Sequence, residues 1–557
     1  MSNPAIAGLG LVLLVAPFAS APLTGAQVVV DVLPGRTAQP APSGQTVIDV
    51  VPMSSPQAGQ PGRTVVNVVP VSAIQVLQLN NSVVNVVPVS TTQQAQATGG
   101  LAICPAELTN ALNRIVARTP GVQWGVQVQT QGGVGNRFNL YGWNPRSQLT
   151  PASNNKIFTT AAALQRLGSQ FRLRTVVTGT TSGANASTLR IIGQGDPSLR
   201  TSHMAVLAQR LNQRGIRQVN LLIGDDTYFR GDPINPNWDP DDTLAGYGAP
   251  VNSLMLNQNG IGVTLFPQRV GQSLRVQWDD PSDAQDYRLN NQSVTVSASQ
   301  GESIDVYRQR NTRIVNIEGQ LRVGAAPEPA AASISNPGNY LVQKFRNALT
   351  AAQITVNQST VVKSTPAPPG EAELAFLESP ALPVLLNETN QESNNIYAEA
   401  LLKTIGKTQN PNNTDARLAG IAGVKTILSP LGVDANQYSM VDGSGLARNN
   451  RTSAEAIVQT LQAMAGIPDN QIYRTSLPVA GVSGTLKSRF RNTTAQGRVQ
   501  AKTGTISGVV GLSGYAAPPN YSPLVFSILA NSPNASATTM RNATDEIVLT
   551  LMRLRRC

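Results

Sequence analysis

The chain has 557 residues, of which 41% are hydrophobic, 13% are charged and one is histidine, and its formal net charge is +11. This length and composition predict about two to four folded units, and the hydrophobic content is sufficient for real hydrophobic cores. The basic residues are scattered, with no dense Lys/Arg run among aromatic residues, so the sequence excludes nucleic acid as the expected partner. The diffuse positive charge suits an anionic surface, or it has no partner at all.

Residues 1–26 have the form of an export signal. The apolar stretch Ala5–Val15 is too short for a comfortable membrane span, and cleavage sites follow at Ala19–Ala21 and at Thr24–Ala26. No Lys or Arg precedes the apolar stretch, so an uncleaved anchor is the alternative. We therefore expect an exported protein of the periplasm or cell envelope.

Residues 27–100 contain a repeat followed by a linker. Four Val-rich copies closed by proline recur every 18 residues, at 29–34, 47–52, 65–70 and 83–88. Units this short cannot bury a core alone, so they stack into a small β layer, pair with a partner or form a spacer. Their polar connectors favour a spacer, which would contact the cell wall or a membrane surface.

The stretch PASNNKIFTTAAALQRLG at 151–168 predicts a helix that begins near Ser153 and ends at Gly168. Ser153 is either a helix cap or a nucleophile. Lys156 lies about one turn later on the same face, and lysine serves as a base when burial or a neighbouring cation lowers its pKa. This motif alone is weak, because serine and lysine occur at this spacing by chance.

Two later motifs strengthen the interpretation of Ser153 as a nucleophile. Ser393 and Asn395 form an S-x-N element before a helix, and Lys502, Thr503 and Gly504 form K-T-G on a predicted strand. The order S-x-x-K, S-x-N, K-T-G is typical of penicillin-interacting serine enzymes. A cation at Lys502 would lower the pKa of Lys156 and attract a substrate carboxylate. The only histidine, His203, reads as an ordinary helix residue and gives no support to a Ser-His-Asp triad.

With these motifs the sequence resembles the class-C low-molecular-mass penicillin-binding proteins, the D-alanyl-D-alanine carboxypeptidase/endopeptidases, from about Leu101 to Cys557. More than two hundred residues separate Lys156 from Ser393, as for the large insert of that family. The stretches GQGDPSL, IGDDTYF, YGAPVNSLMLNQN and VDGSGLARNNRTSA resemble further signatures.

The resemblance implies an α/β (α+β) fold. It consists of a penicillin-binding/serine β-lactamase-like transpeptidase domain, an antiparallel sheet flanked by helices, with a large mainly-β insert between the first two motifs. The expected catalytic domain comprises 101–171 and 369–557, with the insert at 172–368.

The resemblance also implies roles for the motif residues. Ser153 would be the acylated nucleophile and Lys156 its base, Ser393 would relay a proton to the leaving amine, and Asn395 would hold Lys156 and the substrate amide. Lys502 and Thr503 of K-T-G would bind the terminal carboxylate.

The remaining implied contacts surround these groups. The backbone N–H groups of Ser153 and Thr505 would form an oxyanion hole, next to Gly504. Arg448, Asp226 and Phe229 would approach the substrate. Arg448 in a structural ion pair and Asp226 in a turn are the alternatives.

The implied function is a serine-type D-Ala-D-Ala carboxypeptidase and/or endopeptidase that acts on peptidoglycan stem peptides and is acylated by β-lactam antibiotics. We expect no cofactor and no metal. The alternatives are a β-lactamase on the same fold, for which no E-x-x-L-N-type loop is found, and a non-catalytic wall-binding scaffold.

The two cysteines, Cys104 and Cys557, are expected to form a disulfide. One precedes the first helix of the catalytic part and the other ends the last, and in the resembled fold these helices lie side by side. An exported chain meets an oxidising compartment, where two lone cysteines tend to pair. Two free thiols or an intermolecular bridge are the alternatives.

Overall fold

The computed structural model describes residues 101–133, 135–364, 368 and 370–557, together with three strands of the N-terminal segment. The chain divides into two compact units, residues 1–95 and 96–557. The expected signal at 1–26 and the second repeat copy at 47–52 lie outside the described residues. Within the described part, no helix has the length and apolar character needed to cross a membrane.

Three of the four repeat copies form strands in the first unit. β1 (Gln27–Pro34) lies between β2 (Thr64–Asn67) and β3 (Ser82–Val86) in an antiparallel sheet. Asp31 of one copy lies opposite Asn85 of another. The spacer interpretation is therefore wrong for these copies, because their β-branched residues favour strand pairing and the pairing satisfies the backbone groups.

The second unit contains a five-stranded antiparallel sheet built from both ends of the unit. Its order is β20-β21-β22-β4-β5. The strands are β4 (Gln123–Thr130), β5 (Asn139–Trp143), β20 (Val499–Ile506), β21 (Val509–Ala516) and β22 (Leu524–Asn531). The pairing of β22 with β4 joins the two parts of the catalytic domain across the insert.

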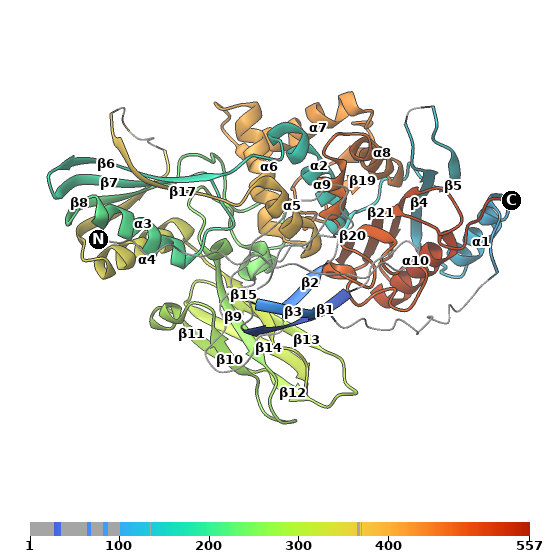
Figure 1. Cartoon of the computed structure of the whole chain (residues 1–557), viewed down its shortest axis with the longest axis horizontal. Helices are drawn as coiled ribbons and strands as arrows, with labels where there is room; N and C mark the ends of the chain where they lie inside the picture. The colour runs from blue at the N-terminus through green and yellow to red at the C-terminus, as the bar shows by residue number, and fades with distance from the viewer. Residues whose placement is uncertain are drawn as a thin grey trace. The chain divides into compact units, whose positions relative to one another are not determined.

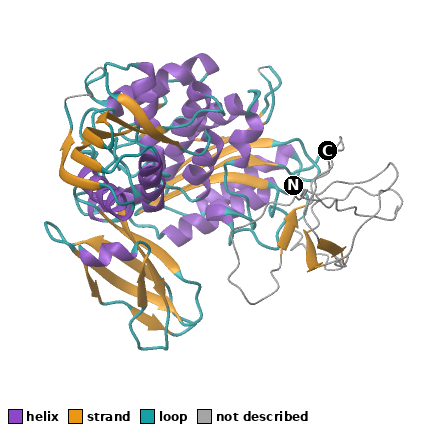
Figure 2. Ribbon diagram, turned by 60° about the vertical axis from the view of Figure 1, so that its left-hand side comes forward, coloured by secondary structure: helices purple, strands orange, loops and turns teal. Residues whose placement is uncertain are grey.

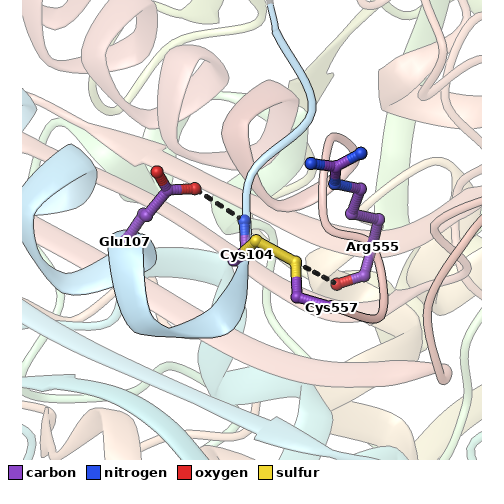
Figure 3. Close-up of a disulfide and its surroundings, with 4 residues drawn as sticks. All are labelled: Cys104, Glu107, Arg555 and Cys557. Atoms are coloured by element: carbon purple, nitrogen blue, oxygen red, sulfur yellow. Dashed lines mark hydrogen bonds between the residues drawn. A yellow bond between two sulfur atoms is a disulfide. The ribbon is translucent and has the colours of Figure 1, made fainter.

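One face of this sheet is covered by the first and last helices, α1 (Pro105–Ala117) and α10 (Ala537–Leu551), which lie side by side (Figure 1). Leu112 and Ile547 from the helices pack with Trp124 and Phe526 from the sheet. Beyond the ends of the two helices, Cys104 and Cys557 form a disulfide, and the Cys104 N–H donates to Glu107 Oε2 at 2.9 Å (Figure 3).

Helices cover the other face as well (Figure 2). Phe158 and Tyr438 stack in this core with ring centroids 4.4 Å apart. The helices are α2 (Lys156–Leu167), α5 (Leu382–Gln391), α6 (Asn395–Gln409), α7 (Ala416–Leu428), α8 (Ala454–Ala465) and α9 (Asn470–Thr475), with the short pair β18 (Tyr438–Ser439) and β19 (Arg451–Thr452) nearby in the chain.

The inserted part has its own five-stranded mixed sheet, with order β16-β8-β7-β6-β17, and its own core. The strands are β6 (Arg174–Ser182), β7 (Asn185–Gly193), β8 (Gln218–Asp225), β16 (Thr355–Val362) and β17 (Ala372–Glu378). Because β17 pairs with β6, this sheet extends past the boundary expected at residue 368.

Two helices and further strands complete the inserted part. The helices are α3 (Thr201–Gln213) and α4 (Pro337–Ala351). The strands are β9 (Gly260–Phe266), β10 (Arg275–Trp278), β11 (Arg288–Asn291), β12 (Val294–Val296), β13 (Ser303–Arg308), β14 (Ile314–Arg322) and β15 (Glu328–Ser333). The fold thus consists of a helix-covered antiparallel sheet, interrupted by a largely β insert between α2 and α5.

Candidate active site

Ser153 lies in a single 3-10 turn, Ala152–Asn155, directly before α2. The N-cap of α2 is Asn155, and no side chain caps the helix, so Ser153 does not act as a cap. The preceding Ala152 has φ +48°, a conformation that non-glycine residues rarely adopt and that concentrates at functional sites. A Cβ on Gly445 would lie 1.9 Å from the Ala152 carbonyl oxygen, so the chain packs tightly around this turn.

Lys156 Nζ connects the first two motifs. It donates to Ser153 Oγ at 3.0 Å, to Asn395 Oδ1 at 2.7 Å and to the Ser444 carbonyl at 2.7 Å. All three acceptors are neutral, and the side chain is fully buried. Burial lowers the pKa of Lys156 to about 7, against the opposing effect of Asp442 and Glu399. A lysine with this pKa is partly neutral near pH 7 and can accept the proton of Ser153.

The second motif lies at the start of α6. Ser393, with φ +58°, accepts a hydrogen bond on Oγ from Lys502 Nζ at 2.8 Å. Asn395 accepts from Lys156 and donates through Nδ2 to the Tyr247 carbonyl at 3.0 Å. The beginning of α6 therefore contacts both lysines of the site.

The third motif is part of β20. Lys502 is fully buried, and its Nζ also donates to the Thr503 carbonyl at 3.0 Å. Burial, and then repulsion from Lys156, hold the pKa of Lys502 well below its ordinary value. The sequence predicted that Lys502 depresses the pKa of Lys156, but burial is the main cause of that shift.

Gly504 allows β20 to lie against the Ser153 turn. A Cβ at this position would lie 2.6 Å from Asn154 Nδ2, 2.8 Å from the Pro151 carbonyl oxygen and 3.1 Å from Ser153 N. The K-T-G glycine is thus required by a close approach of two backbone segments. The exposed Thr505 follows on the same strand, and the Thr503 hydroxyl is 2.7 Å from that of Thr485.

Arg448 is exposed, and its Nη1 donates to the Ser507 carbonyl at 2.9 Å, just beyond β20. Among the described residues it forms no ion pair, so the alternative of a structural ion pair is not what the structure shows. This contact places Arg448 near the end of β20, and its approach to the substrate stays a prediction.

Asp226 and Phe229 lie within the inserted part. The Asp226 carboxylate accepts from Asn252 Nδ2 at 2.9 Å and from the Ser253 N–H at 2.8 Å, and Phe229 is buried against Gly195. These contacts stabilise loops of the insert, and the approach of the two residues to a peptide stays a prediction. In the same part, His203 Nδ1 accepts from the Arg200 N–H at 3.0 Å at the start of α3.

Sequence reasoning missed the carboxylates behind Lys156. Asp442 is fully buried and accepts from the Gly445 and Ala447 N–H groups at 2.8 and 2.7 Å and from Trp238 Nε1 at 3.0 Å. The signature VDGSGLAR contains both Asp442 and Arg448, but its pattern gave a reason to select only Arg448. Glu399 could have been found from its spacing, because it lies four residues after Asn395 on α6.

A cavity of about 1320 Å³ opens beside the second motif, between the start of α6 and strands of the insert. Ser393, Asn395 and Tyr247 line its near end. Its lining is strongly acidic, with Arg200 as the only arginine or lysine. The carboxylates that line it are Asp241, Asp242, Asp279, Asp280, Asp283, Asp305, Glu318, Glu328, Glu388 and Glu392.

Comparison with known proteins agrees with this geometry. The D-Ala-D-Ala carboxypeptidase 3 (S13) family matches residues 108–554. The chain is 35% identical over 416 residues to a D-alanyl-D-alanine carboxypeptidase from Actinomadura sp., covering 72% of this chain and 76% of that protein. It is 27% identical to the penicillin-sensitive carboxypeptidase A of Dictyostelium discoideum, covering 78% and 88% of the two chains.

Among solved structures, penicillin binding protein 4 (dacB) from Haemophilus influenzae has a TM-score of 0.66 at 22% identity, covering 81% of this chain and 98% of that one. A second structure of that protein is complexed with a β-lactam, with a TM-score of 0.62. This likeness confirms the fold class expected from the sequence. The family match over most of the chain and the 35% identical relative agree with the resemblance carried by the three motifs, and the chain belongs to the D-Ala-D-Ala carboxypeptidase family.

Proposed function

We propose that this chain is a penicillin-binding serine carboxypeptidase that removes the terminal D-alanine from D-Ala-D-Ala stem peptides of peptidoglycan. The observation that carries the proposal is the contact between Lys156 Nζ and Ser153 Oγ at 3.0 Å, in a site where burial lowers the pKa of Lys156 to about 7. A nucleophile paired with a partly neutral lysine supports acyl transfer without histidine.

The reaction proceeds through an ester on Ser153. Ser153 Oγ attacks the carbonyl carbon of the scissile peptide bond while its proton moves to Lys156 Nζ. The C–N bond then breaks, and the leaving amine takes the proton from Lys156 through Ser393, whose Oγ also accepts a hydrogen bond from Lys502 Nζ. Water hydrolyses the ester and regenerates Ser153. The N–H groups of Ser153 and Thr505 stabilise the oxyanion at both stages.

The K-T-G strand provides the site for the terminal carboxylate. Lys502 Nζ is buried beside Ser393, and the Thr503 hydroxyl is the next polar group along the strand. A bound carboxylate favours a proton on Lys502. Cross-linked peptides form the same acyl-enzyme, so an endopeptidase activity would share Ser153.

The acidic cavity beside Ser393 and Asn395 suits the amino-bearing part of a stem peptide on the acyl side. Carboxylates in a concave site favour a cationic group through long-range attraction. A peptide with a free side-chain amine should therefore have a lower KM than the same peptide with this amine acetylated. Equal KM values for the two peptides would show that the cavity does not bind the amino-bearing part of the substrate.

Peptidoglycan as the substrate places the enzyme in the cell envelope. We propose export directed by residues 1–26, with the repeat strands as a contact to the wall or membrane surface. Removing residues 27–98 should leave hydrolysis of a soluble peptide unchanged, while binding to isolated cell walls falls.

Labelling with a fluorescent penicillin tests the proposed function. The purified chain should form a stable adduct on Ser153, located by peptide mass analysis, and Ser153→Ala should form none. Ser187→Ala, a serine of the inserted β7, is the matched control and should label as the wild type. Rapid nitrocefin turnover without a stable adduct would favour the β-lactamase alternative, and the absence of both adduct and turnover would favour the scaffold.

A further inference from the structure

Helix α6 carries three polar side chains at four-residue intervals, Asn395, Glu399 and Lys403. This spacing places them on one face of the helix. Glu399 and Lys403 are almost completely buried, with 2% and 3% of their surfaces exposed. Asn395 belongs to the site, but the mechanism above uses neither of the other two. A buried carboxylate this close to a catalytic base calls for a physical account.

Glu399 holds the backbone that receives Lys156. Its Oε1 accepts from the Gly443 N–H at 2.9 Å and from the Ser444 N–H at 2.8 Å. The Ser444 carbonyl accepts from Lys156 Nζ at 2.7 Å, and the Gly443 carbonyl accepts from Thr159 Oγ1 at 2.7 Å. The 443–444 segment is therefore held by α6 on one side and by α2 on the other.

Glu399 also acts on Lys156 through its charge. Asp442 and Glu399 raise the pKa of Lys156 against the larger effect of burial. Burial and the charge of Asp442 in turn raise the pKa of Glu399 itself. The other charged groups around this pair are Lys502, which faces Lys156, and Lys403, which faces Glu399 and is itself influenced by Asp232, Asp415 and Arg417.

We propose that Glu399 is a positioning residue for the general base, which orients Lys156 Nζ through the 443–444 backbone and stabilises the ammonium formed when Lys156 takes the proton of Ser153. This inference rests on the proposed role of Lys156. The proton balance is simple: the Ser153 O–H bond breaks, the Lys156 N–H bond forms, and no proton moves to or from Glu399, which carries its charge above a pKa that burial and Asp442 raise to about 7. Without the negative charge of Glu399, Lys156 becomes a weaker base.

The test is the pH dependence of acylation by penicillin in Glu399→Gln. The amide oxygen keeps both backbone hydrogen bonds, while the charge is lost. A lower pKa of Lys156 moves the acidic limb of the profile to lower pH by roughly half to one unit. The weaker base also lowers the plateau rate by about 3- to 10-fold. Glu399→Asp keeps the charge on a shorter side chain, so the acidic limb stays in place and only the plateau falls.

Glu371→Gln is the matched control, because it removes a buried carboxylate from the inserted sheet, where Glu371 pairs with Arg190. It should lower stability without moving the acidic limb. A Glu399→Gln profile with the acidic limb of the wild type would overturn the proposal. If Lys156→Met still acylated at the wild-type rate, the proposed function itself would fail, which is a separate outcome.

A second measurement applies if Glu399→Gln does not fold. The carboxyl ¹³C signal of Glu399 can be titrated by NMR in the wild type and in Lys156→Met. Because coupling between two sites is reciprocal, loss of the lysine should raise the titration midpoint of Glu399. Identical midpoints in the two proteins would show that Glu399 and Lys156 are not coupled.

Discussion

Two buried cations of the inserted part and two buried lysines of the catalytic part have opposite kinds of hydrogen-bond partner. In the insert, Lys344 contacts Asp280 at 2.9 Å and Asp283 at 2.6 Å, and Arg190 likewise lies between two carboxylates. In the catalytic part, Lys156 and Lys502 are fully buried, yet among the described residues they donate hydrogen bonds only to hydroxyl, amide and backbone oxygens.

The difference separates structural charges from chemical ones. Carboxylate partners favour the charged form of a buried cation, whereas burial among neutral acceptors favours its neutral form. The pKa values of Lys156 and Lys502 are lowered by burial for this reason. Lys344 and Lys156 are buried to a similar extent, but their hydrogen-bond partners differ, and these partners decide which of the two lysines serves structure and which serves chemistry.

The largest expected effect comes from replacing Lys156 of the active site, and the comparison is with replacement of Lys344 of the insert. Lys156→Met should reduce penicillin acylation by about 100- to 10 000-fold, because the general base is lost. It should also stabilise the fold. The pKa of Lys156 is about 7 in the folded chain and 10.5 ordinarily, so the cost of burying this lysine is greatest below about pH 7 and disappears as the pH rises toward 10.5. The gain in urea stability should follow the same trend.

Lys344→Met should have the opposite effects, because it lowers stability and leaves acylation unchanged. It leaves Asp280 and Asp283 without their partner, at a cost of about 3–5 kcal/mol in the free energy of unfolding, while the folded fraction acylates at the wild-type rate. Equal stability losses in the two variants would contradict the comparison.

The disulfide allows the stabilities of the two parts to be compared, because both of its cysteines belong to the catalytic part. Replacing Cys104 and Cys557 with serine opens a loop of 453 residues, and the chain-entropy model gives a stability loss of up to about 6 kcal/mol. Hydrogen exchange should show the first loss of protection in α1 and α10, while the inserted sheet, with a separate core, keeps its protection. Simultaneous loss in both parts would show one cooperative unit.

Lys502→Ala should cost about 2–4 kcal/mol in kcat/KM for a peptide that ends in a free carboxylate, as for other single electrostatic groups in active sites. The same peptide with a C-terminal amide is the control and should lose much less. An equal loss for both peptides would show that Lys502 serves the site without binding the carboxylate.

Gly504→Ala should slow acylation by about 10- to 100-fold, because the new Cβ would meet the Pro151 carbonyl and Asn154 and displace the oxyanion-hole backbone. Gly301→Ala in the insert is the matched control, since a Cβ there has open space around it. The rates of penicillin acylation are measured for the two variants. A wild-type rate in Gly504→Ala would show that the close approach of β20 to the Ser153 turn does not require glycine.

The smallest expected effect is the pH dependence of the wild type. Acylation requires neutral Lys156, whose pKa is lowered by burial to about 7, so the rate should rise with pH, roughly fivefold between pH 6 and pH 7. Stopped-flow acylation at constant ionic strength measures it. A flat profile across this range would mean that Lys156 is not the titrating base.

The sequence by itself determined the order of the three motifs, the fold class and the family, and it predicted Ser153 as the nucleophile and Lys156 as its base. These follow from short local patterns, because Ser153 and Lys156 are one turn apart and K-T-G is a single strand. The cysteine pair could also be expected, since it joins the two ends of one domain.

Only the tertiary structure decided what surrounds those residues. Burial, which is the main cause of the lowered pKa of Lys156, is produced by elements far apart in the chain, and Glu399 acts on this lysine through its charge and through the 443–444 backbone. Asp226 proved to hold a loop of the insert, and β17 joined the inserted sheet through pairing with β6. Local patterns name the reacting groups, but long-range packing determines their charge, because proton affinity depends on every buried neighbour.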